Sequence, residues 1–85
     1  MGAIVPRLNN IDLDLLRAFV SVVDLGSFTR AADVLLRRQS TLSLQIKRLE
    51  QSLGRRLLDR SSRRLRLTAE GDALLDHARE MLRLN

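Results

Sequence analysis

The segment from Gln39 to Leu53 constrains the fold more tightly than any other stretch of this chain. Its apolar residues, Leu42, Ile46, Leu49 and Leu53, recur at steps of four, three and four. In an α-helix these residues fall within a sector of about 60°, which fits one buried face. The sequence therefore predicts a helix over 39–53 that packs one side into a core and exposes the other.

The side away from the apolar stripe carries hydroxyl, amide and cationic groups, with one leucine among them: Ser40, Leu44, Lys47, Arg48 and Gln51. Such groups can contact base edges and phosphates, so this composition is typical of a helix that lies in the DNA major groove. The alternative is an ordinary amphipathic helix with a solvated polar face. The segments on either side of the helix favour the first interpretation.

Positive charge is concentrated around this helix. The chain has 85 residues and a formal net charge of +5, a length that fits one small domain. Residues 30–66 contain eleven Lys and Arg against three acidic residues, whereas residues 1–29 and 67–85 are net acidic. A basic middle segment indicates a surface that binds a polyanion, flanked by parts with another role.

The composition also excludes several classes of protein. There is no cysteine, so disulfides and thiolate metal sites are excluded. His77 is the only histidine and accompanies no recognisable nucleophile, metal-ligand spacing or glycine-rich phosphate loop. We expect neither an enzyme nor a cofactor. No apolar run of membrane length and no signal peptide are present, so we expect a cytoplasmic protein without membrane contact.

Two helices are predicted before the 39–53 helix. The first runs from about Leu13 to Asp24, with Asp12 as its N-cap and Gly26 just after its end. Ser27 can cap the second, a short helix whose apolar residues are Phe28, Ala31, Ala32 and Leu35. Only residues 36–38 separate this short helix from the 39–53 helix. Two helices so connected form a helix-turn-helix.

Residues 55–67 change to the two-residue period of a β-hairpin, because Leu65 and Leu67 alternate with Arg64 and Arg66. We predict a small two-stranded wing with a cationic tip. Its arginines could contact phosphates or a narrow minor groove, namely Arg60, Arg63 and Arg64. A solvated basic hairpin is the alternative.

A last helix is predicted from Thr68, its N-cap, to the end of the chain. It has one apolar stripe and a weaker second apolar edge, which suggests a dimerisation arm. The residues assigned to dimerisation are Ala73, Leu74, His77, Ala78, Met81 and Leu84. The alternative is a helix that caps the core of the monomer.

Candidate DNA contacts follow from position on the 39–53 helix and the turn before it. Base-edge contacts are predicted for the N-terminal half of the helix, at Gln39, Ser40, Ser43 and Leu44. Leu44 could cover a thymine methyl group, or it could simply be one exposed leucine. Phosphate contacts, which position a domain without reading sequence, are predicted for Thr29, Arg30, Gln45, Lys47 and Arg48.

Three stretches together resemble the N-terminal domain of the LysR-type transcriptional regulators: DLDLLRAFVSVVDLGSFTRAADVL, QSTLSLQIKRLEQSLGRRLLDR and RRLRLTAEGDALLDHAR. The resemblance covers roughly residues 11–85. It implies a mainly α, winged helix-turn-helix fold that binds pseudo-palindromic promoter DNA as a homodimer or higher oligomer. It also implies a DNA-binding domain (11–67) and a linker helix that dimerises (68–85). Residues 1–10 show no periodicity and contain the only proline, so we expect them to form a flexible leader. The C-terminal effector domain of the family has no counterpart in this chain.

Two positions depart from the family pattern. Relatives usually carry an aliphatic residue at the position of Arg37, and a Ser or Thr that caps the next helix at the position of Arg38. We hypothesise that Arg38 is tolerated because it contacts a DNA phosphate, which adds it to the predicted phosphate contacts. The alternative is that this member has altered or impaired DNA recognition.

A basic winged-helix module could instead bind RNA or a protein partner. Sequence-specific RNA readers usually offer aromatic stacking platforms. This chain has two Phe and no Tyr or Trp, and both Phe lie on predicted core faces. The aromatic content therefore favours duplex DNA over RNA.

Overall fold

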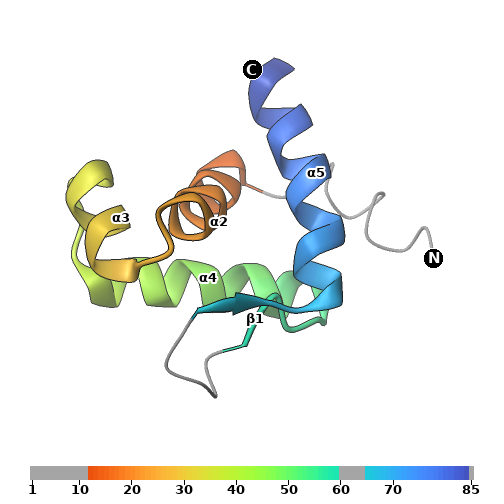
Figure 1. Cartoon of the computed structure of the whole chain (residues 1–85), viewed down its shortest axis with the longest axis horizontal. Coiled ribbons are helices and arrows are strands. Elements are labelled where there is room, and N and C mark those ends of the chain that lie inside the picture. The colour runs from red at the N-terminus through yellow and green to blue at the C-terminus, as the bar shows by residue number, and fades with distance from the viewer. Residues whose placement is uncertain (1–11, 60–64, 85) are drawn as a thin grey trace.

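Four helices and a two-stranded sheet make up the part of the chain that the computed structural model describes, residues 12–59 and 65–84. In chain order these elements are α2 (Leu13–Leu25), α3 (Phe28–Leu35), α4 (Gln39–Leu53), β1 (Leu58–Asp59), β2 (Arg66–Leu67) and α5 (Ala69–Leu84). The mainly α fold with a wing is therefore confirmed (Figure 1). The predicted leader and the predicted wing arginines, Arg60, Arg63 and Arg64, lie outside the described residues.

Side-chain caps begin α2 and α3 as predicted. The carboxylate of Asp12 accepts the N–H of Asp14 at 2.9 Å, and the hydroxyl of Ser27 accepts the N–H of Arg30 at 3.2 Å. Gly26 adopts the left-handed conformation (φ 65°) that ends α2 after Leu25, one residue beyond the predicted end. The turn between the two helices is thus fixed by residues whose chemistry is visible in the sequence.

The turn between α3 and α4 is less regular. Leu36 ends α3 in the left-handed conformation, with φ 57°, and its side chain is 91% exposed. Arg38 occupies the N-cap position of α4 but makes no capping hydrogen bond with its side chain. α4 nevertheless spans the predicted residues and ends at Gly54, whose φ is 67°.

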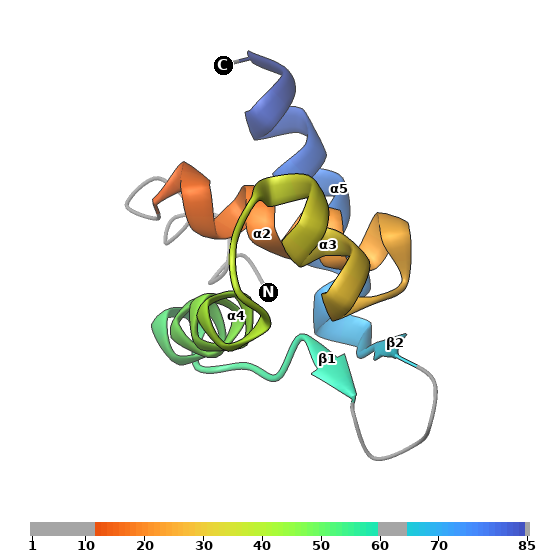
Figure 2. The ribbon, with the colours of Figure 1, turned by 90° about the vertical axis from the view of Figure 1, so that its left-hand side faces the viewer.

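One core joins all four helices and the wing. Figure 2 shows α2 and α3 above α4, with the wing beside α4 and the N-terminal start of α5. The apolar stripe of α4 is buried, which confirms the predicted inner side of this helix. The largest fully buried side chains are Leu16, Phe19, Val22, Leu42, Ile46, Leu49, Leu57, Leu58 and Leu74.

Glu50, near the C-terminal end of α4, connects this helix to the wing. Its carboxylate oxygen accepts the backbone N–H groups of Leu57 at 2.8 Å and Leu58 at 3.2 Å. β1 then pairs antiparallel with β2, with Leu58 opposite Leu67 and Asp59 opposite Arg66. The wing is therefore positioned by the same helix that we predict to enter the groove.

α5 begins against the segment that leads into the wing. Thr68 donates its N–H to the carbonyl of Leu57 at 3.0 Å, and its hydroxyl accepts the N–H of Gly71 at 3.0 Å. The predicted N-cap role of Thr68 agrees with this geometry. Farther along, Arg79 donates to both carboxylate oxygens of Asp24 on α2, at 2.6 and 3.2 Å. These hydrogen bonds hold the pKa of Arg79 above its usual value.

The dimerisation assignment needs correction at two residues of α5. Leu74 and Ala78 are fully buried within the core of this chain, so neither can offer a surface to a partner. The apolar stripe of α5 packs on α2 because it has to cover that side of a small core. Ala73 and His77 are exposed, and Met81 is partly buried against the core. The side chain of Leu84 lies outside the described part of the structure.

Candidate nucleic-acid interface

The outer face of α4 is the exposed side of the helix formed by Ser40, Leu44, Lys47, Arg48 and Gln51. Every one of these residues is exposed, as the sequence predicts. In Figure 1, α2 and α3 lie on one side of α4, and the wing lies near the C-terminal half of this helix. Because no described segment covers the outer face, a duplex could approach α4 along its length.

The predicted base-contacting residues lie on the first turns of α4. Gln39 and Ser40 are exposed, and Ser43 is half-buried on the flank of the helix. Leu44 is 49% exposed and is one of three large apolar side chains exposed among the described residues. An apolar side chain between hydroxyl and amide groups suits a base edge that carries a methyl group, as thymine does.

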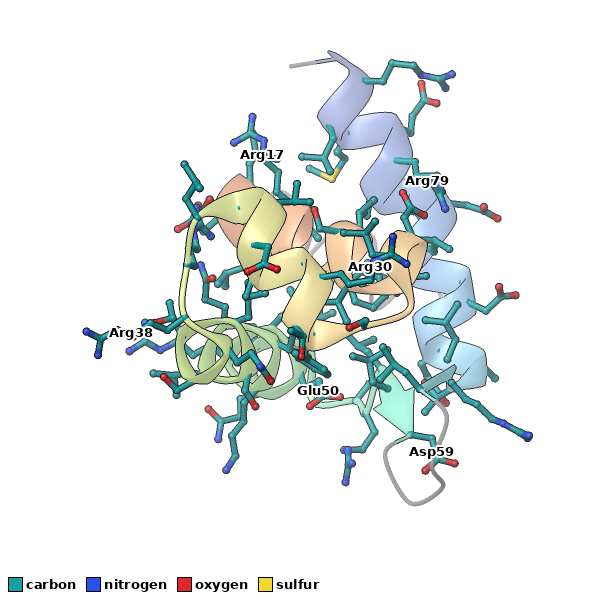
Figure 3. All side chains as sticks on the ribbon, turned by 60° about the vertical axis from the view of Figure 1, so that its left-hand side comes forward. Arg17, Arg30, Arg38, Glu50, Asp59 and Arg79 are labelled. Atoms are coloured by element: carbon teal, nitrogen blue, oxygen red, sulfur yellow. The ribbon has the colours of Figure 1, made fainter. Side chains whose placement is uncertain are left out.

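Three cations accompany these residues. Arg38, Lys47 and Arg48 are exposed, and none of them forms an ion pair with a residue that the structure describes. The side chain of Arg38 extends away from the protein at the start of α4 (Figure 3). Cations without an acidic partner are available to neutralise DNA phosphates, so this arrangement suits the predicted phosphate contacts. Thr29 and Arg30, at the start of α3, are also exposed.

Gln45 requires a correction. Its amide oxygen accepts a hydrogen bond from Arg37 at 3.0 Å, and its amide nitrogen donates to Asp14 at 2.9 Å. Both ends of the amide are thus engaged within the chain, so Gln45 is not presented as a phosphate contact. The sequence prediction failed because Gln45 lies on the flank of α4 that faces the start of α2.

Arg37 and Asp14 are the residues that sequence reasoning missed. Arg37 donates to Asp14 at 2.7 Å, and together with Gln45 they close a ring of three side chains. The guanidinium of Arg37 is the main reason that the pKa of Asp14 lies below its usual value, while burial opposes the shift. Twenty-three positions separate the two residues, and no periodicity in the sequence connects them.

An open hollow of about 540 Å³ lies beside the C-terminal half of α4. Lys47 and Gln51 line it from α4, and Arg55 and Arg56 line it from the segment that leads to β1. Arg56 lies 3.8 Å from the carboxylate of Glu50, which is itself largely buried. The adjacent pair of arginines was the available sequence signal for this part of the surface. Arg55 and Arg56 extend the cationic surface of α4 toward the wing.

Within residues 12–59 and 65–84, no three His, Cys, Asp or Glu side chains are grouped so that they could hold a metal ion. None of the helices in those two ranges has both the length and the apolar character needed to span a bilayer.

Known proteins resemble this chain in both sequence and structure. Residues 13–72 match the family model described as bacterial regulatory helix-turn-helix protein, lysR family. The HTH-type transcriptional regulator PecT of Dickeya dadantii is 47% identical over 76 residues, which are 89% of this chain and 24% of PecT. PtxR of Pseudomonas aeruginosa is 46% identical over 82 residues, which are 96% of this chain and 26% of PtxR. The chain thus spans about a quarter of the length of these curated relatives.

Solved structures give the same result. The BenM DNA-binding domain in complex with catB site 1 DNA superposes with a TM-score of 0.81 at 46% sequence identity. The match covers 85% of this chain and 81% of that one. The complex of the same domain with benA site 1 DNA gives a TM-score of 0.82 over the same coverage. Sequence and fold agree, and the chain therefore belongs to the lysR family of bacterial regulatory helix-turn-helix proteins.

Proposed function

We propose that this chain binds double-stranded DNA in a sequence-specific manner, with α4 in the major groove and the wing on the backbone and minor groove. The observation that carries the proposal is the outer face of α4, where hydroxyl and amide groups, and cationic groups without an ion pair to any described residue, surround one exposed leucine. The fold supports it, because the similar BenM domain was solved as a complex with DNA.

The residue roles divide by chemistry. Groups that can read base edges lie on the first turns of α4: Gln39, Ser40, Ser43 and Leu44. Groups that can hold phosphates lie at the start of α3, along α4 and in the segment that leads to β1: Thr29, Arg30, Arg38, Lys47, Arg48, Arg55 and Arg56. The wing arginines, Arg60, Arg63 and Arg64, remain predicted minor-groove contacts. Gln45 is not included among the proposed phosphate contacts, because its amide is hydrogen-bonded to Arg37 and Asp14.

The proposal includes a homodimer on a pseudo-palindromic promoter site. α5 leads away from the helix-turn-helix (Figure 1), and its flank carries the exposed residues Ala73 and His77. We assign 11–67 to DNA binding and 68–85 to dimerisation. A two-fold dimer reads two inverted half-sites, so the symmetry of the protein predicts the symmetry of its operator. We propose a role in transcription regulation in the cytoplasm, where a bacterial promoter is found.

Selection of bound duplexes from a random pool tests the proposal. The chain is incubated with duplexes that contain a random core of about twenty base pairs, and the bound fraction is sequenced after several rounds. We expect enrichment of one half-site in two inverted copies. Competition with RNA of equal length separates duplex DNA from the alternative RNA ligand. Recovery of no common sequence, or stronger competition by RNA, would refute the proposed function.

A further inference from the structure

Asp14, Arg37 and Gln45 form a closed hydrogen-bonded ring, which we call the Asp14–Arg37–Gln45 triad. Arg37 donates to Asp14 at 2.7 Å and to Gln45 at 3.0 Å, and Gln45 donates to Asp14 at 2.9 Å. The exposed fraction is 28% for the Arg37 side chain and 38% for Asp14. Both carboxylate oxygens and both ends of the amide are used. Such a two-point contact fixes the planes of all three groups as well as their distances.

The triad lies next to the start of α4, which lacks the side-chain cap that usually begins a helix. Arg38 contributes no side-chain cap, and the first backbone hydrogen bond of α4 runs from the N–H of Leu42 to the carbonyl of Arg38 at 3.1 Å. The amides of the first turn have no partner within the helix, so this turn is prone to fray. Arg37 immediately precedes the uncapped turn, and its side chain is tied to α2.

The two tied positions bracket the stretch that carries the predicted base contacts. Arg37 precedes Gln39 by two residues, and Gln45 directly follows Leu44. Both are held to the same carboxylate, which projects from the first turn of α2. The base-reading turns of α4 are therefore anchored at each end to one point on a neighbouring helix.

We infer that the triad determines DNA sequence specificity by positioning α4, although none of its members touches DNA. The inference rests on the proposed function, in which residues 39–44 of α4 read base edges. Direct readout needs each donor and acceptor to be held close to its ideal position, whereas phosphate contacts tolerate small displacements. Loss of the triad should therefore reduce discrimination between sequences more than it reduces general affinity for duplex DNA.

Two variants of the triad change the net charge in opposite directions, so together they distinguish an effect on the position of α4 from an effect of charge on DNA affinity. Arg37→Met removes a positive charge and should weaken binding to any duplex, whereas Asp14→Asn removes a negative charge and should strengthen it. Under the inference, both variants lower the specificity ratio by about tenfold, the amount that one lost base contact produces. The specificity ratio is the affinity for the selected duplex divided by that for a shuffled duplex of equal length.

Matched controls change the same charges outside the triad. Arg66→Met on β2 and Asp33→Asn on α3 alter exposed residues that make no ion pair with a described residue. These variants should shift general affinity and leave the specificity ratio within about twofold of the wild-type value. Affinities are measured at 10 °C, and circular dichroism gives the folded fraction of each variant, so unfolding cannot be mistaken for lost specificity.

If Arg37→Met folds poorly, Arg37→Lys replaces it in the test. Lysine keeps the positive charge but can make only one of the two hydrogen bonds, so we expect a specificity ratio between those of the wild type and Asp14→Asn. The double variant with Asp14→Asn and Arg37→Met should lose no more specificity than either single variant, because all three break the same ring. An unchanged ratio in folded Asp14→Asn and Arg37→Lys would overturn the inference. A wild-type ratio near one would instead refute the proposed function, so the two failures are distinguishable.

Discussion

A Cβ atom placed on Gly71 would lie 2.1 Å from the backbone carbonyl oxygen of Leu57. The same carbonyl oxygen accepts the N–H of Thr68, so the first turn of α5 lies directly on the segment that enters β1. Because Glu50 of α4 binds the N–H of Leu57 from the other side, α4, the wing and α5 meet around one residue. Contacts made through backbone atoms leave little room for adjustment.

Gly71→Ala should therefore destabilise the domain. Alanine normally stabilises a helix relative to glycine by about 1 kcal/mol. Here the added methyl group must displace backbone, so we expect a net loss of about 1–3 kcal/mol in the free energy of unfolding, as for overpacked cores. Thermal unfolding followed by circular dichroism measures it. An increase in unfolding temperature would show that the close approach of Gly71 and Leu57 is wrong.

Leu36→Gly should stabilise the domain. Leu36 adopts the left-handed conformation, with φ 57°, which is unfavourable for a residue with a side chain. Its side chain is 91% exposed, so little packing offsets this cost. Removing the side chain should relieve about 1 kcal/mol. Val34→Gly is the matched control, because Val34 is also an exposed apolar residue but lies inside α3, where replacing valine by glycine should destabilise by about 0.3–0.5 kcal/mol. Urea unfolding of both variants should give opposite signs, and equal signs would contradict the role of backbone conformation.

The Asp14–Arg37–Gln45 triad should make stability depend on pH in the acid range. The pKa of Asp14 is lowered in the folded chain, chiefly by the hydrogen bond from Arg37. The ionised form is therefore favoured by folding. Its contribution to stability is fully present above the usual aspartate pKa and is lost as pH falls through the lower pKa of the folded state. Urea unfolding between pH 2 and 6 should show a smaller decrease at low pH for Asp14→Asn than for the wild type. Identical pH profiles would argue against the ion pair.

Much of the fold could be predicted because local signals agreed with the global structure. The stripe of α4 specified its inner side, and Asp12, Gly26, Ser27, Gly54 and Thr68 marked helix ends by their own chemistry. Periodicity could not tell which apolar side of α5 the core would use. That choice depends on how α5 packs on α2, and it is why Leu74 and Ala78 were wrongly assigned to a dimer.

The candidate site was predictable only where a side chain points outward from α4. Helical spacing placed Ser40, Leu44 and Lys47 on the exposed side. The pairing of Arg37 with Asp14 joins two segments that meet only through tertiary packing, so no local sequence pattern indicates it. Gln45 was misassigned for the same reason, because a residue on the flank of a helix meets solvent or a neighbouring helix depending on the fold.

Arg38→Thr should have opposite effects on stability and on DNA binding. A threonine at the N-cap of α4 can accept an N–H from the first turn, and it removes a positive charge from the positive end of the helix dipole. We expect a gain of about 1 kcal/mol in the free energy of unfolding. DNA affinity should fall, and the slope of its logarithm against that of salt concentration should decrease by about one. Tighter DNA binding by this variant would contradict a phosphate contact at Arg38.

The most direct test of base reading by the outer face of α4 is duplex selection with Leu44→Gln. Leu44 is 49% exposed on that face, and glutamine there can pair with adenine, whereas leucine can only cover an apolar group. The enriched sequences should change at one position of each half-site. Val34→Gln, which alters a 64% exposed residue of α3, should leave the enriched sequence unchanged. The same enriched half-site for Leu44→Gln as for the wild type would contradict base reading by this face of α4.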